Sequence, residues 1–225
     1  MLDWLFAPQC AACGTAAETL CESCARTLLE LGRACMRCAE PCETDLCRRC
    51  AVDPLPLDQV VSPWRFGGQL ATAIRRLKFA ARAHVARDLA PLWAPLLAAA
   101  AEAHDAVITP VPMHWRRRLA RGYDHAWLLA LHACAAAKLP RPRPLLRRVR
   151  AAPAQSTLSA AERQANLVGA FAARDGREIA GRAIVLVDDV VTTGATLAAA
   201  ARPLREAGAT VIVGVALARA ATVLT

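Results

Sequence analysis

Two adjacent carboxylates, Asp188 and Asp189, stand where a short apolar run meets a threonine-rich segment. The run AIVLV at 183–187 has the composition of a buried strand, and TTGAT at 192–196 leads into an alanine-rich stretch. Carboxylates can accept hydrogen bonds from vicinal ribose hydroxyls or hold a divalent cation. Hydroxyls and free N–H groups at a helix N-terminus can surround a phosphate. The order of these parts predicts a site for a sugar phosphate.

Helix capping would account for the acidic pair or for the threonines taken alone, because Asp and Thr are both good N-cap residues. It does not account for strand, carboxylates, loop and helix in this order. Gly194 removes a side chain where the backbone must approach a phosphate most closely. The glycine-rich motifs of dinucleotide-binding and P-loop proteins do not occur in the chain.

The elements that must position these groups alternate along the chain. A strand with an internal proline is expected at 60–66, and other strands at 106–111, 183–187 and 210–217. Helices are expected at 70–79, 117–138, 156–167 and 195–207, and a helix or a helix pair broken by Pro91 and Pro95 at 85–103. This alternation predicts an α/β fold, a parallel sheet with helices on both faces. Ligands of such sheets bind beyond the carboxyl ends of the strands, where 110–112 and 188–196 fall.

The N-terminal quarter of the chain is dominated by cysteine. Eight of its cysteines form four C-x-x-C pairs, namely Cys10 with Cys13, Cys21 with Cys24, Cys35 with Cys38 and Cys47 with Cys50. Two such pairs complete a tetrahedral zinc site with four thiolate ligands. A module this short, with few large apolar side chains, needs metal in order to fold. The sequence therefore predicts two structural zinc ions in a double zinc ribbon over 1–54, followed by the α/β domain over 55–225.

The spacing alone leaves two pairings of the C-x-x-C turns open, sequential and interleaved, of which the sequential one is favoured. Disulfides are the alternative to zinc, but they require an oxidising compartment. The first residues, MLDWLFAPQC, lack the basic and apolar regions of a signal peptide, so a cytoplasmic protein is expected. Cys42 is spare, and Cys134, in an apolar stretch, is expected to be a buried small residue. The longest apolar run, 89–101, is too short to span a bilayer, so no membrane insertion is expected.

The positive charge of the chain is concentrated in one segment. The formal net charge is +9, and the segment 113–150 carries ten Lys and Arg residues against one acid, Asp124. Such a segment favours a polyanionic partner, either a phosphorylated small molecule or a nucleic-acid backbone. A solvated, arginine-rich surface is the alternative.

The stretch AIVLVDDVVTTGATL at 183–197 resembles the signature with which type I phosphoribosyltransferases bind 5-phosphoribosyl 1-diphosphate (PRPP). The resemblance widens to nearly the whole chain when the four cysteine pairs are joined by LKF at 77–79, PVP at 110–112, RGY at 121–123 and Gln155, Arg163, Asn166 and Phe171. In this order they resemble the ComF family, a zinc-finger-bearing branch of the phosphoribosyltransferase superfamily. The long segment 146–171 looks like a cover over the site.

The resemblance implies roles for individual residues. Asp188 and Asp189 would hold the ribose hydroxyls, with Mg²⁺ bridging these hydroxyls and the pyrophosphate. Arg121 would act with the arginines at 116–118 on the leaving pyrophosphate. The residues implied to bind PRPP are Asp188, Asp189, Arg116, Thr192, Thr193, Gly194, Ala195 and Thr196. The family string RGFNQ is RGYDH here, so Asp124 and His125 replace two amides, and His125 could carry a proton or simply make a hydrogen bond.

Two functions follow from these patterns and the resemblance. The first is a phosphoribosyltransferase whose acceptor, a nitrogen nucleophile, is unidentified. The second is a non-catalytic single-stranded DNA-binding protein that acts with the competence machinery in DNA uptake, with PRPP as a regulatory ligand. The ComF resemblance implies the link to natural competence, and the basic segment fits a DNA backbone.

Overall fold

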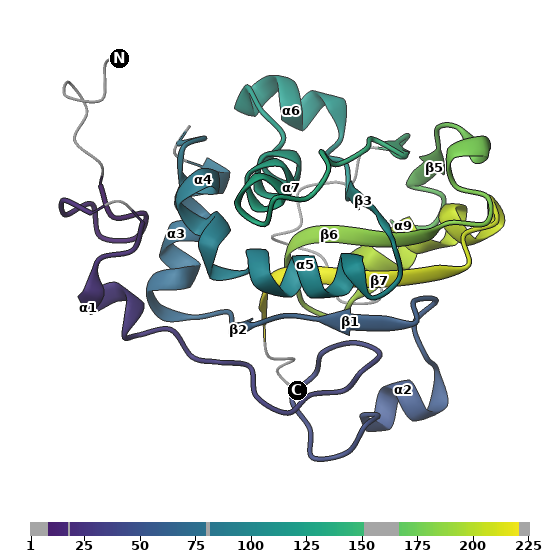
Figure 1. The fold of residues 1–225 in the computed structure, drawn as a ribbon, viewed down its shortest axis with the longest axis horizontal. Coiled ribbons are helices and arrows are strands. Elements are labelled where there is room, and N and C mark those ends of the chain that lie inside the picture. The colour runs from purple at the N-terminus through teal and green to yellow at the C-terminus, as the bar shows by residue number, and fades with distance from the viewer. Residues whose placement is uncertain (1–8, 18, 80–81, 151–166, 221–225) are drawn as a thin grey trace.

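The computed structural model describes residues 9–17, 19–79, 82–150 and 167–220, and Figure 1 shows their arrangement. Gln155, Arg163, Asn166, the helix expected at 156–167 and most of the expected cover lie outside the described residues. Every structural statement below concerns the described part of the chain.

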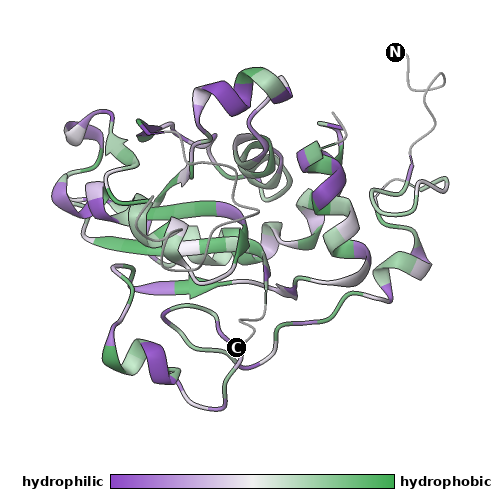
Figure 2. Ribbon diagram, turned by 180° about the vertical axis from the view of Figure 1, so that it is seen from behind, coloured by the Kyte–Doolittle hydropathy of each residue, from purple (hydrophilic) through white to green (hydrophobic). Residues whose placement is uncertain are grey.

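A parallel sheet forms the centre of the molecule. Its strands run in the order β1 (Gln59–Val61), β7 (Val211–Arg219), β6 (Ala183–Val191) and β3 (Val107–Pro110), and β2 (Trp64–Arg65) also pairs with β7. β6 and β7 are almost continuously apolar because helices cover both faces of the sheet. Their green colour in Figure 2 reflects this composition. The predicted α/β fold is confirmed.

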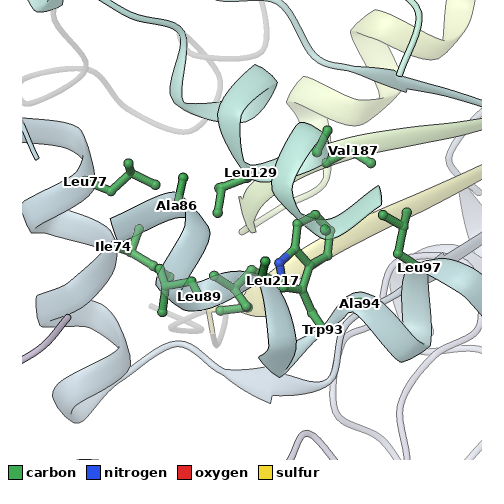
Figure 3. Packing of buried hydrophobic residues seen from close by; sticks show 14 of the residues in the cluster. Ile74, Leu77, Ala86, Leu89, Trp93, Ala94, Leu97, Leu129, Val187 and Leu217 are labelled. Carbon is green, nitrogen blue, oxygen red and sulfur yellow. The ribbon is translucent and has the colours of Figure 1, made fainter. Parts of the chain in front are cut away.

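Alternate residues of β6 enter two separate cores. Val185 and Val187 face a cluster built with α3 (Gly68–Phe79), α4 (Val85–Leu89), η1 (Ala90–Leu92), α5 (Ala94–Glu102) and α7 (His125–Ala136). Ile184 and Leu186 face the opposite cluster, which includes α9 (Ala195–Glu206). Trp93, fully buried, packs among the residues drawn in Figure 3. The period of two along β6 thus places one layer of helices on each face of the sheet.

Several elements differ from their expected bounds. β6 continues through Asp188 and Asp189 as far as Val191, because it stays paired with β7 up to Arg219. The helix expected at 117–138 is two helices, α6 (Trp115–Arg121) and α7, separated at Gly122, whose φ is +86°. The strand expected at 60–66 is divided into β1 and β2 at Ser62 and Pro63, since proline has no N–H to donate to a ladder.

Smaller elements lie at the margins of the sheet. β4 (Leu146–Arg148) and β5 (Phe171–Ala173) form an antiparallel pair, followed by η3 (Gly176–Glu178). The cysteine-rich segment contributes two short helices, α1 (Glu22–Ala25) and α2 (Arg48–Val52). In Figure 1, α1 lies beside α3, and α2 lies below β1. None of the helices in the described ranges combines the length and the apolar character needed to cross a membrane.

Leu129 of α7 is fully buried in the core that contains Val185 and Val187, so its truncation tests the packing of α7 on the sheet. Leu129→Ala is expected to lower the free energy of unfolding by about 3 kcal/mol, because a cavity is left in a close-packed core. Leu119→Ala on α6, where the side chain is 77% exposed, is the matched control and should change it by about 0.5 kcal/mol or less. Urea denaturation followed by circular dichroism measures both. Equal losses in the two variants would contradict this packing.

Candidate functional site

A cavity of about 940 Å³ opens where β3 and β6 end. The elements that reach it are α3, the segment between β3 and α6, α6, α7, β4 and the loop after β6. Its polar lining consists of Lys78, Arg117, Arg121, His125, Arg148, Asp188, Asp189, Thr192, Thr193 and Thr196. The structure therefore brings the acidic pair, three threonines of the 192–196 loop and part of the basic segment into one cavity.

Asp189 is a nearly buried carboxylate, 4% exposed, that is paired with two side chains from other elements. Its Oδ2 lies 2.5 Å from Nζ of Lys78 on α3 and 3.4 Å from Nε2 of His125 on α7. Burial alone would raise the pKa of Asp189, but the Lys78 ammonium and His125 outweigh burial and hold that pKa below its usual range. The ionised form of Asp189 is therefore stabilised by side chains of α3 and α7.

His125 connects Asp189 to Arg121. Nη1 of Arg121 lies 3.0 Å from Nδ1 of His125. Because a guanidinium can only donate, Nδ1 must accept, which leaves the ring hydrogen on Nε2 facing Asp189. His125 thus lies between Arg121 and Asp189 and orients both, and these contacts favour the hydrogen-bonding role over proton transfer.

Asp188 differs from its neighbour in exposure and in the direction of its pKa shift. Its side chain is half-buried and lines the cavity, while Oδ1 accepts a hydrogen bond from the Asp189 N–H at 2.9 Å. Burial and the adjacent Asp189 charge raise the pKa of Asp188 to about 7, although Lys78 and His125 oppose the shift. A cation or a set of hydroxyl donors in the cavity would favour the ionised form of Asp188.

The 192–196 loop makes a tight entry into α9. Gly194 has a φ of +79°, a conformation that residues with a Cβ rarely adopt. A Cβ at this position would also lie 2.5 Å from Cδ1 of Leu55. The Thr193 hydroxyl accepts a hydrogen bond from the Ala195 N–H at 3.3 Å. The first turn of α9 has N–H groups without intrahelical acceptors, which suits an anion.

Arg148 is a cavity residue that the motifs did not single out. Its guanidinium stacks 5.3 Å from the Phe171 ring centre, and its Nη2 is buried without a hydrogen-bond partner among the described residues. Burial and the nearby Arg117 lower its pKa. The antiparallel β4–β5 pair places Arg148 here, and its position in the basic segment was the only signal in the sequence. Lys78 was also missed, although it belongs to the LKF string.

The other predicted residues of the basic segment lie at different places. Arg117 and Arg121 line the cavity. Arg116 is not among the lining residues, and its guanidinium lies 5.2 Å from the Trp115 ring. Asp124 is the N-cap of α7, where it accepts hydrogen bonds from the N–H groups of Ala126 and Trp127. The acid that replaces a family amide therefore has a structural role at the start of α7.

The eight paired cysteines form two groups in chain order, which confirms the sequential pairing. The first cluster is Cys10, Cys13, Cys21 and Cys24, and the second cluster is Cys35, Cys38, Cys47 and Cys50. In each cluster the sulfur atoms lie within 4.8 Å of one another. The Cys13–Cys21 and Cys38–Cys47 Sγ distances are both 3.6 Å, close to the ~3.8 Å edge of a tetrahedron of thiolates around zinc and far beyond a disulfide bond. The donors therefore fit two structural zinc sites.

The two remaining cysteines stand outside these clusters. Cys42 donates a hydrogen bond from its thiol to the Thr44 carbonyl at 3.0 Å. Cys134 is 1% exposed within the α7 layer, as predicted, and burial raises the pKa of its thiol to about 11.

Two known protein domains match separate parts of the chain. Residues 130–224 match the phosphoribosyl transferase domain, and residues 1–52 match the double zinc ribbon domain. DNA utilization protein YhgH of Salmonella typhimurium is 32% identical over 86% of this chain and 87% of its own length. Competence protein F of Haemophilus influenzae is 33% identical over 77% of this chain and 78% of its own. Competence protein ComFC of Bacillus subtilis is 30% identical over 85% of this chain and 80% of its own.

The raised pKa of Asp188 predicts that ionisation of this carboxyl lowers the free energy of unfolding of the ligand-free protein. The unfolded carboxyl ionises near pH 4 and the folded one near pH 7, so stability falls as the pH rises between these values. Asp188→Asn is therefore expected to stabilise the protein by about 2 kcal/mol at pH 8, less than the full shift implies because the side chain is partly solvated, and by almost nothing at pH 4. Thermal unfolding without Mg²⁺ measures this difference. A stability change that is the same at both pH values would contradict the assignment.

Proposed function

The chain belongs to the ComF family, the zinc-ribbon-bearing branch of the phosphoribosyltransferase superfamily, and on this premise we propose that its cavity binds PRPP with Mg²⁺. The observation that carries the proposal is the separation of charge within the cavity. Asp188 and the first residues of α9 line the cavity from β6 and the loop after it, whereas Arg117 and Arg121 line it from α6 and Arg148 from β4. A ribose that carries phosphate groups at both ends has the complementary pattern.

The proposed pose follows from this separation. Asp188 accepts hydrogen bonds from the ribose hydroxyls, because it is the carboxylate not already paired with Lys78. The 5-phosphate occupies the loop 192–196, where Gly194 provides the left-handed turn that leads into α9. The pyrophosphate then faces Arg117, Arg121 and Arg148, whose guanidinium groups can chelate phosphate oxygens. The unpartnered Nη2 of Arg148 gains an acceptor in this pose.

Mg²⁺ requires oxygen ligands and partial hydration, which the Asp188 carboxylate and the ligand's own oxygens can supply. When bound, it would neutralise charge on the pyrophosphate. The contribution of the protein is to position the ribose and to hold developing negative charge with fixed cations. In a transfer reaction the bond from C1 to the pyrophosphate oxygen breaks, and a nitrogen nucleophile forms the new bond to C1.

Thermal stabilisation by PRPP with Mg²⁺ tests the binding proposal. A ligand specific for the folded state must raise the melting temperature, and at 100 times its dissociation constant it contributes about 3 kcal/mol. Asp188→Asn and Arg148→Met are each expected to lose at least tenfold in PRPP affinity. Glu206→Gln, an exposed change at the far end of α9, should bind like the wild type.

Absence of stabilisation in the wild type at millimolar PRPP would overturn the site. Pyrophosphate release from PRPP across a panel of bases and amines then separates an enzyme from a binding protein. Release that depends on one acceptor and is lost in Asp188→Asn would identify the reaction.

A second proposed function is single-stranded DNA binding, for which α6 supplies a specific surface. Trp115 is 60% exposed and Leu119 is 77% exposed on a helix that also carries Arg116 and Arg118. An exposed aromatic ring beside guanidinium groups is what stacking on a base and pairing with the adjacent phosphates require. The relatives' names, which refer to competence and DNA utilization, agree with a role of this chain in DNA uptake.

Trp115→Ala is expected to weaken binding to a fluorescent oligothymidine by about 1–3 kcal/mol, because one stacked base is lost. Arg116→Gln with Arg118→Gln should instead reduce the slope of log affinity against log salt by about 1–2. Leu29→Ala, an exposed apolar change outside α6, is the control and should leave both quantities unchanged. Fluorescence anisotropy across a salt series measures them. Wild-type binding with a slope near zero would contradict the DNA role.

A further inference from the structure

Arg219, at the end of β7, is a guanidinium group that the fold buries almost completely. It is 1% exposed, and burial lowers its pKa against the opposing effect of Glu40. Its Nη2 donates to Oε2 of Glu40. Glu40 lies two residues after Cys38, a member of the second cluster. A buried charge of this kind is costly without a partner. Glu40, in the segment between the cysteines of the second cluster, therefore supplies the countercharge of a core residue of the α/β domain.

The same guanidinium contacts the backbone from which the 192–196 loop begins. Nη1 of Arg219 donates to the carbonyl of Val191 at 3.3 Å, and the Ala220 N–H donates to that carbonyl at 2.9 Å. Val191 is the last residue of β6, directly before Thr192. Glu40 thus acts through Arg219 on the first peptide of the loop.

Leu55 connects the second cluster to Gly194, within the same loop. It packs against the cysteines of this cluster, and its Cδ1 occupies the space next to Gly194 where a Cβ would otherwise lie. Gly194 begins α9 in the left-handed conformation. The residue before the loop and Gly194 within it therefore both contact groups that lie next to the second cluster.

The first cluster has different surroundings. Cys10 and Cys24 belong to the core cluster that contains Leu70 and Ile74 of α3, and α1 contacts α3. The two cysteine clusters are equivalent in the sequence pattern, but in the described structure the second is the one joined to the loop through Glu40, Arg219 and Leu55.

We infer that the second cluster holds the 192–196 loop in the geometry that receives a phosphate, with Glu40 and Arg219 as positioning residues. Zinc binding at the second cluster and PRPP binding in the cavity then strengthen each other, because coupling between two sites is reciprocal. This inference rests on the proposed binding of PRPP. It adds that one of two similar zinc sites is thermodynamically linked to the ligand.

The test measures the equilibrium affinity of the protein for zinc, by competition with a chromophoric chelator, with and without saturating PRPP and excess Mg²⁺. We expect one of the two ions to bind about fivefold or more tightly when PRPP is present. A Cys13→Ser/Cys21→Ser chain, which retains the second cluster intact, assigns the ion. Calorimetry on the same samples reports whether PRPP binds.

Three variants separate positioning from stability. Glu40→Gln leaves Arg219 without its countercharge and is expected to lower stability as well as coupling. Glu40→Gln/Arg219→Met removes both charges at similar volume, so it should keep the fold while the PRPP effect on zinc affinity falls below about twofold. Glu43→Gln, an exposed change in the same ribbon, is the matched control and should retain the full effect.

The outcomes are distinguishable. A wild type that binds PRPP by calorimetry with unchanged affinity for both zinc ions overturns this inference alone, as does a double variant that keeps the fivefold effect. A wild type that binds no PRPP overturns the proposed function and this inference with it. Tighter zinc binding by the wild type and the Glu43 control, lost in the double variant, supports the link.

Discussion

The charge of Asp189 is the constraint on which the arrangement of the site depends. A carboxylate that is 4% exposed at the end of a sheet strand must be paired or it would be protonated. Lys78 and His125 come from α3 and α7, which are separated by about fifty residues of chain, and both reach the same Oδ2. This pairing holds two helices against the end of β6. It also leaves Asp188, rather than Asp189, as the carboxylate available to a ligand.

The two cysteine clusters lie next to different elements that line the same cavity. The first lies against α3, the helix that carries Lys78 to Asp189. The second is joined to the 192–196 loop through Arg219, which binds Glu40, and through Leu55. A chain with an alanine-rich composition has few large side chains for bracing its loops. Two metal-stabilised turns can supply that rigidity without a larger hydrophobic core.

The arginines of the basic segment 113–150 lie on two separate surfaces. Arg117, Arg121 and Arg148 face the cavity, whereas Arg116 and Arg118 lie on α6 with exposed Trp115 and Leu119. The basic segment is therefore two surfaces rather than one. A small phosphorylated ligand and a nucleic-acid strand would use different arginines, so the two proposed functions do not exclude each other.

The chemistry of the site and the order of the elements could be predicted from local patterns in the chain. Apolar runs predicted the parallel strands, the acidic pair with the Thr/Gly loop predicted the site, and the C-x-x-C spacing predicted two zinc ribbons; these features are local, so they can be seen along the chain. Strand ends were less well predicted, because the end of β6 depends on its pairing with β7.

The contacts between distant residues could not be predicted from local patterns, because they depend on how the folded elements pack. The Asp189–Lys78 pair, the placement of Arg148 over Phe171 and the bond from Glu40 to Arg219 join residues far apart in the chain, and no periodicity encodes such contacts. The same holds for the difference between the two aspartates. Adjacent in sequence and identical in type, they differ in the direction of their pKa shifts, because β6 turns Asp189 toward Lys78 and His125 and leaves Asp188 without such a pair.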